Sequence, residues 1–328
     1  MVNRIAVVTP VLDDWKSFVA LLAEISNEFA GSNYMFDVYA VDDGSVIAVD
    51  LQKIELPQDT CIARIEIVHL ALNLGHQRAI AVGLCEVADR ADIDTVIVMD
   101  SDGEDRPVEI AALLANSREQ PGDIVLAGRT KRSEKFAFRL GYSLYRALFR
   151  ILTGQGISFG NYSALPIAAV RRLVYMPDLW NNLAASVMRS RLPYRVVPTI
   201  RGVRYHGRSR MNLTSLTVHG LSAMSVHTET IFVRVLLGAS LVGGLSVMGI
   251  IGVALIRFAT DLAIPGWATT VAGDLLIIIF QALVIVVAVS LMMLAGRSSR
   301  PIIPIADCRA FVAEREHRQL NHDDRAVA

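Results

Sequence analysis

Short apolar runs and helically spaced apolar residues alternate along the N-terminal part of the chain. The runs are rich in β-branched residues and predict buried strands over Arg4–Val11, Phe36–Val41, Ile65–Leu70, Thr95–Met99 and Asp123–Ala127. Helical spacing predicts helices over Trp15–Phe29, about Gln77–Ala88 and Pro107–Arg118. Strands that alternate with helices indicate an α/β fold with a mostly parallel sheet and helices on both faces.

Two long apolar runs without a charged residue follow near the C-terminus. Val235–Ile256 has 22 residues and Leu275–Ala295 has 21. Each is long enough to cross a hydrocarbon core of about 30 Å as a helix. A soluble, buried helical hairpin would give the same pattern, but two runs of this length favour a transmembrane hairpin. Glycines in the first run suit close helix packing in lipid and also allow a homo-oligomer.

The segments before these runs mix basic and apolar residues. Phe136–Thr153 predicts a basic, aromatic-rich helix, either in the headgroup plane or packed against the sheet. Asn212–Val233 has a similar character and leads into the first run. We therefore expect a cytosolic domain (1–211), a juxtamembrane amphipathic helix (212–234), a transmembrane hairpin (235–295) and a cytosolic tail (296–328).

Charge indicates the orientation of the hairpin. Five arginines precede the first run and two follow the second, whereas the loop Arg257–Asp274 holds one Arg and two Asp. The positive-inside bias predicts an integral protein of the cytoplasmic membrane with both termini in the cytoplasm. We expect no signal peptide, because Met1 leads directly into a strand pattern.

Overall charge and cysteine content exclude some classes of partner and site. Lys plus Arg equals Asp plus Glu at 32 each, so charge predicts no nucleic-acid partner. The cysteines Cys61, Cys85 and Cys308 are far apart in the sequence and match neither a disulfide framework nor a metal-knuckle spacing.

Four carboxylates gather where the predicted strand Thr95–Met99 ends. Asp100, Asp102, Glu104 and Asp105 fall within six positions. In an extended segment, Asp100 and Asp102 project to the same side, about 7 Å apart. Such charge needs water, a cation or basic groups, and oxygen ligands favour Mg²⁺ or Mn²⁺, which usually arrive with substrate phosphates. A solvated acidic loop is the alternative interpretation.

Two other strand ends carry polar groups. Asp42 and Asp43 follow the second predicted strand, and Asn73 and Gly75 follow the third. Ligands bind beyond the carboxyl ends of parallel strands, so these groups and the acidic cluster are expected to converge. Taken alone, Asp-Gly-Ser after Asp42 is also ordinary turn chemistry.

Five short motifs occur in an order that resembles a known family. They are Thr9-Pro10, Val41-Asp-Asp-Gly-Ser45, Asn73-Leu-Gly75 with Ala79 and Gly83, Met99-Asp-Ser-Asp102 and Gly128-Arg129. Together they resemble a family-2 glycosyltransferase of the GT-A fold. The later Arg204-Tyr-His-Gly-Arg-Ser-Arg210, followed by two apolar runs, is similar to the polyprenyl-phosphate branch, the relatives of dolichol-phosphate mannose synthase. The resemblance covers roughly residues 4–295.

This resemblance implies a fold and a reaction. The fold would be a Rossmann-like GT-A domain followed by a two-helix transmembrane hairpin. The reaction would transfer a hexose, with inversion, from a UDP- or GDP-sugar to a polyprenyl phosphate at the cytosolic membrane face. Transfer to another lipid or to a growing polysaccharide is an alternative, and so is a membrane-tethered nucleotide-sugar-binding protein without turnover.

The resemblance also implies roles for individual residues. Nucleotide-sugar binding would fall to Pro10, Asp42, Asp43, Asn73, Gly75, Asp100 and Ser101. Asp100 and Asp102 would hold Mg²⁺ or Mn²⁺. In relatives, this motif is usually followed by Gln or His and two prolines. Here the resemblance implies one of two roles: Glu104 as an extra metal ligand, or Arg106 as a contact to phosphate. We assign His76 no ligand role.

The acceptor site is implied by basic residues and by one departure from the family pattern. Arg129, Arg204, Ser209 and Arg210 would bind the acceptor phosphate, although the later arginines also fit topology alone. Asp102, Arg129 and Asn161 would be catalytic. Asn161 stands in a stretch where many relatives carry a carboxylate. Either no base is needed, because a phosphate monoester is already ionised, or the acceptor or sugar differs.

Overall fold

The computed structural model describes residues 3–57, 60–129, 147, 149–154, 159–207, 221–260, 266–298 and 300–320. The chain divides into two compact units. We call the first, made of 1–140, 157–226 and 302–328, the α/β unit. The second, made of 141–156 and 227–301, is the helical unit.

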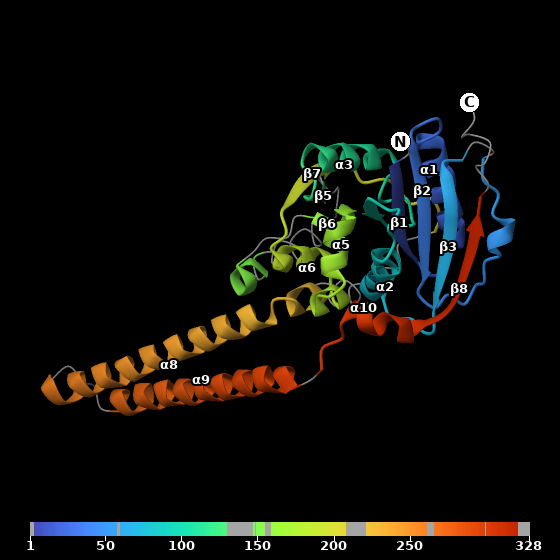
Figure 1. Cartoon of the computed structure of the whole chain (residues 1–328). Coiled ribbons are helices and arrows are strands. Elements are labelled where there is room, and N and C mark those ends of the chain that lie inside the picture. The colour runs from blue at the N-terminus through green and yellow to red at the C-terminus, as the bar shows by residue number, and fades with distance from the viewer. Residues whose placement is uncertain are drawn as a thin grey trace. The chain divides into compact units, whose positions relative to one another are not determined.

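The α/β unit is built on one sheet of eight strands (Figure 1). The strands are β1 (Asn3–Val11), β2 (Tyr34–Asp42), β3 (Ile62–Leu70), β4 (Thr95–Val98), β5 (Ile124–Arg129), β6 (Phe159–Pro166), β7 (Tyr194–Thr199) and β8 (Val312–Gln319). Their order is β7-β5-β6-β4-β1-β2-β3-β8. Among the strands that the structure describes, only β6 and β8 run antiparallel to their neighbours, so the predicted, mostly parallel sheet is confirmed.

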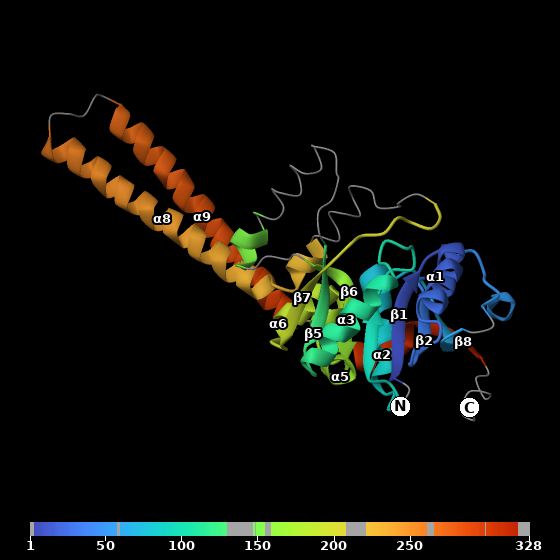
Figure 2. The ribbon, with the colours of Figure 1, turned by 90° about the horizontal axis from the view of Figure 1, so that it is seen from above.

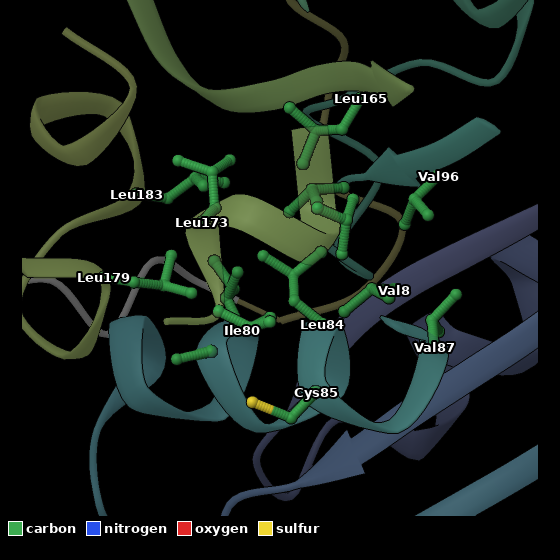
Figure 3. Close-up of a cluster of buried hydrophobic side chains, with 14 of the residues drawn as sticks. Val8, Ile80, Leu84, Cys85, Val87, Val96, Leu165, Leu173, Leu179 and Leu183 are labelled. Atoms are coloured by element: carbon green, nitrogen blue, oxygen red, sulfur yellow. The ribbon is translucent and has the colours of Figure 1, made fainter. Parts of the chain in front are cut away.

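Helices cover both faces of this sheet. One apolar cluster contains α1 (Trp15–Glu28) and α3 (Val108–Glu119). The other, shown in Figure 3, contains α2 (His76–Ala88), α5 (Ile167–Leu173), α6 (Leu183–Ser190) and the short helix η2 (Pro177–Trp180). Alternate strand residues point to opposite faces, so Val7 joins the first cluster and Val8 the second.

Helix α2 lies close to the sheet at Gly83. A Cβ there would come within 2.5 Å of Val8 Cγ1 and 2.9 Å of Val41 Cγ2. The glycine therefore lets α2 approach β1 and β2 more closely than any other residue would allow.

Part of the segment expected to be a tail joins the sheet. After α9 the chain forms α10 (Pro304–Asp307), the short helix η3 (Cys308–Phe311) and β8, which pairs with β3 from Arg64 to Leu70 (Figure 1). The sequence Val312-Ala-Glu-Arg-Glu-His-Arg-Gln319 is polar because β8 is an edge strand with mostly exposed side chains. It therefore lacked the apolar alternation by which strands are predicted.

The helical unit contains two helices that are long and apolar enough to cross a membrane. They are α8 (Thr228–Ala259) and α9 (Trp267–Ser298), and they contain the two predicted runs. They lie side by side in both views (Figures 1 and 2). A Cβ at Gly249 would lie 3.0 Å from Leu275 Cδ1, so this glycine supports the contact.

The two predicted amphipathic segments are described only in part. Residues 147 and 149–153 are helical, and Arg234 at the start of α8 donates to the carbonyl of Ile151. The remainder of Phe136–Thr153 and the first part of Asn212–Val233 lie outside the described residues.

Candidate active site

The carboxyl ends of β1, β2 and β4 meet at one edge of the sheet, as predicted. Asp42 is the last residue of β2, and Asp100 follows β4 closely. Ser101 Oγ donates to the Pro10 carbonyl at 3.2 Å, which ties the acidic loop to β1. The residues predicted to bind a nucleotide-sugar are thus brought to one edge from distant parts of the chain.

Asp42 is held by two elements. One carboxylate oxygen accepts from the Ser45 N–H at 2.9 Å, and the other lies 2.8 Å from His69 Nδ1. His69 Nε2 lies 3.2 Å from a carboxylate oxygen of Glu316 on β8. Asp42 is only 6% exposed, and the Ser45 N–H and His69 Nδ1 hold its carboxylate in place.

Asp43 organises the loop that follows β3. Its carboxylate accepts from the N–H groups of Leu74, at 2.7 Å, and Gly75, at 3.0 Å. Burial raises the pKa of Asp43, and these two hydrogen bonds oppose that effect. Gly75 has φ of +93°, a conformation that side chains disfavour, and precedes the first residue of α2. The exposed Asn73 lies in this same loop.

The acidic loop is folded on itself. Asp105 is buried and accepts from the Asp100 N–H at 3.0 Å, while Asp102 accepts from the Glu104 N–H at 2.9 Å. Burial, with the nearby charge of Asp100, raises the pKa of Asp102 to about 6. The loop therefore holds more negative charge than its own hydrogen bonds neutralise.

Residues that follow β7 neutralise part of this charge. Arg204 lies 3.1 Å from Asp102 and 3.2 Å from Asp14, and Arg201 pairs with Glu104. The backbone follows the acidic loop, because Gly202 N–H donates to the Glu104 carbonyl and Tyr205 N–H to the Asp102 carbonyl, each at 2.8 Å.

His76 is a site residue to which sequence reasoning gave no role. Its Nε2 lies 3.3 Å from an Asp100 carboxylate oxygen and 3.1 Å from the Asn161 side-chain nitrogen. Partial removal from water lowers the pKa of His76, but the carboxylates of Asp100, Asp105 and Asp43 outweigh it, so the net pKa is raised. The feature of the sequence that could have indicated this residue is its position directly after Gly75, at the start of a predicted helix.

Asn161 and the backbone of Arg129 are among the described residues. Asn161 lies on β6, whose neighbour β4 leads into the acidic loop. The backbone of Arg129 ends β5 opposite Thr199 of β7. The Arg129 side chain, Ser209 and Arg210 lie outside the described residues. Their roles stay predictions.

The carboxylates of the acidic loop are the candidate ligands for a divalent ion. Within the described ranges, no three His, Cys, Asp or Glu side chains are grouped as a ready metal site. Asp100 and Asp102 nevertheless offer the oxygen ligands that Mg²⁺ and Mn²⁺ prefer, and their excess charge suits a cation. Glu104 is engaged by Arg201. The fit is therefore to the Asp100–Asp102 pair, with the remaining ligands supplied from outside the chain.

Comparison with known proteins identifies the family. The sequence profile of glycosyl transferase family 2 matches residues 6–171, about half of the chain. The chain belongs to glycosyl transferase family 2. This membership and the mostly parallel sheet confirm the expected GT-A fold class, and the predicted enzyme class is confirmed as glycosyltransferase.

Relatives of this family-2 protein include one that acts on a lipid phosphate. The chain is 27% identical over 175 residues to the undecaprenyl-phosphate 4-deoxy-4-formamido-L-arabinose transferase of Proteus mirabilis. The match covers 53% of this chain and 51% of that protein, so the chain spans about half of the relative's length.

Solved structures with a similar fold include glucosyl-3-phosphoglycerate synthase from Mycobacterium tuberculosis. Its complex with Mn²⁺, UDP-glucose and phosphoglyceric acid has 16% sequence identity and a TM-score of 0.48, covering 71% of this chain and 79% of that one. Its complex with Mg²⁺ and UDP has 14% identity and a TM-score of 0.47, covering 70% and 79%.

Proposed function

We propose that this family-2 glycosyltransferase transfers a hexose from a UDP- or GDP-sugar to a polyprenyl phosphate, with inversion, at the cytosolic face of a membrane. The observation that carries the proposal is the Asp100–Asp102 pair beside Asp42 and Asp43 in a chain with two membrane-length helices. The relative named for transfer to undecaprenyl phosphate supports the acceptor class.

Donor binding would use groups that the fold already orients. Asp42 and Asp43 each keep lone pairs beyond their present contacts, and a carboxylate accepts hydrogen bonds from a base N–H or a ribose hydroxyl. Because both are buried and held by backbone N–H groups, little order is lost when they bind.

Asp100 and Asp102 would hold Mg²⁺ or Mn²⁺ against the donor diphosphate. Such an ion, when bound, neutralises charge that builds on the departing nucleoside diphosphate. Arg204 balances Asp102 in this structure, and its planar guanidinium also matches phosphate. The chain thus offers cationic groups on the same side as its carboxylates.

The acceptor needs alignment more than deprotonation. A phosphate monoester has a second pKa of about 6 and is largely ionised at neutral pH. One of its oxygens would attack the anomeric carbon while the bond to the nucleoside diphosphate breaks, so no proton has to move in that step. This is consistent with Asn161, an amide, where relatives carry a carboxylate.

The test is transfer by the full-length protein in detergent micelles that contain undecaprenyl phosphate. Labelled UDP- and GDP-hexoses would be offered with Mn²⁺ or Mg²⁺, and lipid-linked label measured. We expect label from one nucleotide class, lost with chelator and reduced at least about a hundredfold in Asp102→Asn. Asp123→Asn is the matched control, because Asp123 pairs with Arg195 at the start of β5, away from the carboxyl edge.

Two results would contradict the proposal in different ways. Undiminished transfer by Asp102→Asn or with chelator would remove the role of the carboxylate pair. Tight nucleotide-sugar binding with no transfer to any lipid phosphate would favour a binding protein without turnover.

A further inference from the structure

Two cysteines that the sequence separates meet in the α/β unit. Cys85 lies on α2, and Cys308 begins η3, beyond both membrane-length helices. Both are free thiols and are only 5% and 3% exposed (Cys85 is labelled in Figure 3). The fold thus creates a thiol pair that spacing alone did not indicate, and the transfer reaction proposed above does not use it.

The pair lines a cavity of about 410 Å³. Its polar lining consists of Cys85, Glu86, Asp89, Cys308, Arg309 and Arg315. Glu86 and Arg315 pair across it at 2.7 Å, which joins α2 to β8. Cavities of about 300–1,000 Å³ admit small molecules, so a small solute can reach the buried thiols.

The two thiols are chemically unequal. The neighbouring Cys308 thiol, together with burial, raises the pKa of Cys85. The neighbouring Cys85 lowers the pKa of Cys308, as do Arg309 and Arg315, whereas burial and Glu86 oppose this shift. The thiolate is the nucleophile in disulfide exchange, and cationic groups stabilise it. Arg309, next to Cys308 in the chain, and Arg315 line the cavity, so we assign Cys308 as the attacking sulfur and Cys85 as the resolving one.

We propose that Cys85 and Cys308 form an oxidation site that reacts with low-molecular-weight disulfides and closes an intramolecular bridge. The Cys308 thiolate attacks one sulfur of the small disulfide and releases one small thiolate, which leaves a mixed disulfide. Cys85, losing its proton, then attacks Cys308 and releases the second small thiol. The small disulfide is reduced to two thiols, and the two cysteines are oxidised.

The bridge would connect α2 to the segment that carries β8. Helix α2 begins at His76 beside Asp100, and β8 carries Glu316 to His69. Oxidation would therefore fix the C-terminal strand on the sheet, whereas the reduced pair leaves it held by non-covalent contacts. A small thiol in excess would reverse the reaction.

The test counts thiols in the full-length protein after incubation with glutathione disulfide, alkylation and mass spectrometry. We expect free thiols to fall from three to one, with a peptide that links Cys85 to Cys308. Cys61→Ser is the matched control and should fall from two to none. Cys85→Ser and Cys308→Ser should form no internal bridge. Oxidised wild-type protein should also unfold at a higher temperature than reduced protein, a shift that these two variants lack.

Glutathione adducts on single cysteines without the linked peptide would overturn the proposal, as would three thiols left unreacted in wild-type protein. Circular dichroism of each Ser variant, matched to wild type, separates a missing bridge from a missing fold.

Discussion

At the residue scale, the acidic loop is a place where function and stability oppose each other. Asp102 has a side chain that is 14% exposed and lies near Asp100. Arg204 and Arg201 lower the cost of its charge without removing it, since the pKa of Asp102 is still raised to about 6. A buried carboxylate with a raised pKa, close to a second carboxylate, is what a cation-binding site requires when no cation is bound.

Replacing Asp102 should make the metal-free protein more stable. The folded pKa is about 6 and the unfolded value is near 3.8, so folded protein binds the proton more tightly between these values. The contribution of Asp102 to the free energy of unfolding is then most favourable below about pH 4, falls as the pH rises to about 6 and stays low above it. Asp102→Asn should raise stability at pH 8 by up to about 3 kcal/mol and abolish the decline.

Thermal unfolding in chelator at pH 5 and pH 8 measures this effect. Asp123→Asn serves as the control, because Asp123 pairs with Arg195 away from the loop. A variant at Asp102 that melts below wild type at pH 8 would show that its ion pair with Arg204 outweighs its burial.

At the scale of elements, α2 and β8 set the position of the site. Helix α2 carries His76 at its first turn and packs on the sheet through Gly83. Strand β8 covers the edge of β3 and supplies Glu316 to the His69–Asp42 contact. Both elements can therefore affect substrate binding through the residues that they position.

Adding one methyl group at Gly83 should loosen α2. In Gly83→Ala the Cβ would lie 2.5 Å from Val8 Cγ1, so helix or strand must shift. Overpacking of this kind costs about 1–3 kcal/mol, measurable as a lower Tm. Combining it with Val8→Ala should recover part of the loss, and strictly additive losses in the double variant would exclude a direct clash.

Removing the charge of Glu316 should weaken donor binding without unfolding the protein. Glu316→Gln removes a charge that lies 3.2 Å from His69 Nε2, and for such a partly exposed pair the cost is at most about 1 kcal/mol. That corresponds to at most a roughly fivefold higher Kd for the nucleotide-sugar, measured by isothermal titration. Glu314→Gln, two residues earlier on the same exposed strand, is the control and should bind normally. Equal affinities for both variants would show that Asp42 is positioned without β8.

The sequence predicted best what apolar periodicity encodes. The first five strands and first three helices were found within a few residues, because buried parallel strands read as β-branched runs. Strand β6 contains Gly160, Asn161 and Ser163, which obscure alternation, and β8 is an exposed edge. The contacts of Arg201, Arg204 and His76 depend on how distant loops fold over one another, which no local pattern encodes.

At the scale of the whole molecule, strand pairing supplies a topological constraint. β7 lies before α8 in the chain and β8 lies after α9, yet both belong to one sheet. If α8 and α9 span a membrane, the chain must return to the side it left. This constraint is independent of the arginines from which the same topology was predicted.

Site-directed labelling can check this topology in cells. In a cysteine-free background, Gly266→Cys lies between the spans and Ser298→Cys lies at the end of α9. We expect a membrane-impermeant maleimide to label only the first variant in intact cells and both after permeabilisation. Labelling of both before permeabilisation would be incompatible with a spanning hairpin whose ends share one sheet.

The late position of β8 also orders the protein's biosynthesis. β3 ends at Leu70 and β8 begins at Val312, so the strand edge of β3 waits while both apolar helices are made. At about 5–20 residues per second this interval lasts roughly 12–50 s. Until then the nascent chain exposes an unpaired edge, where other strands can add. The sheet can therefore be completed only after both helices have been synthesised.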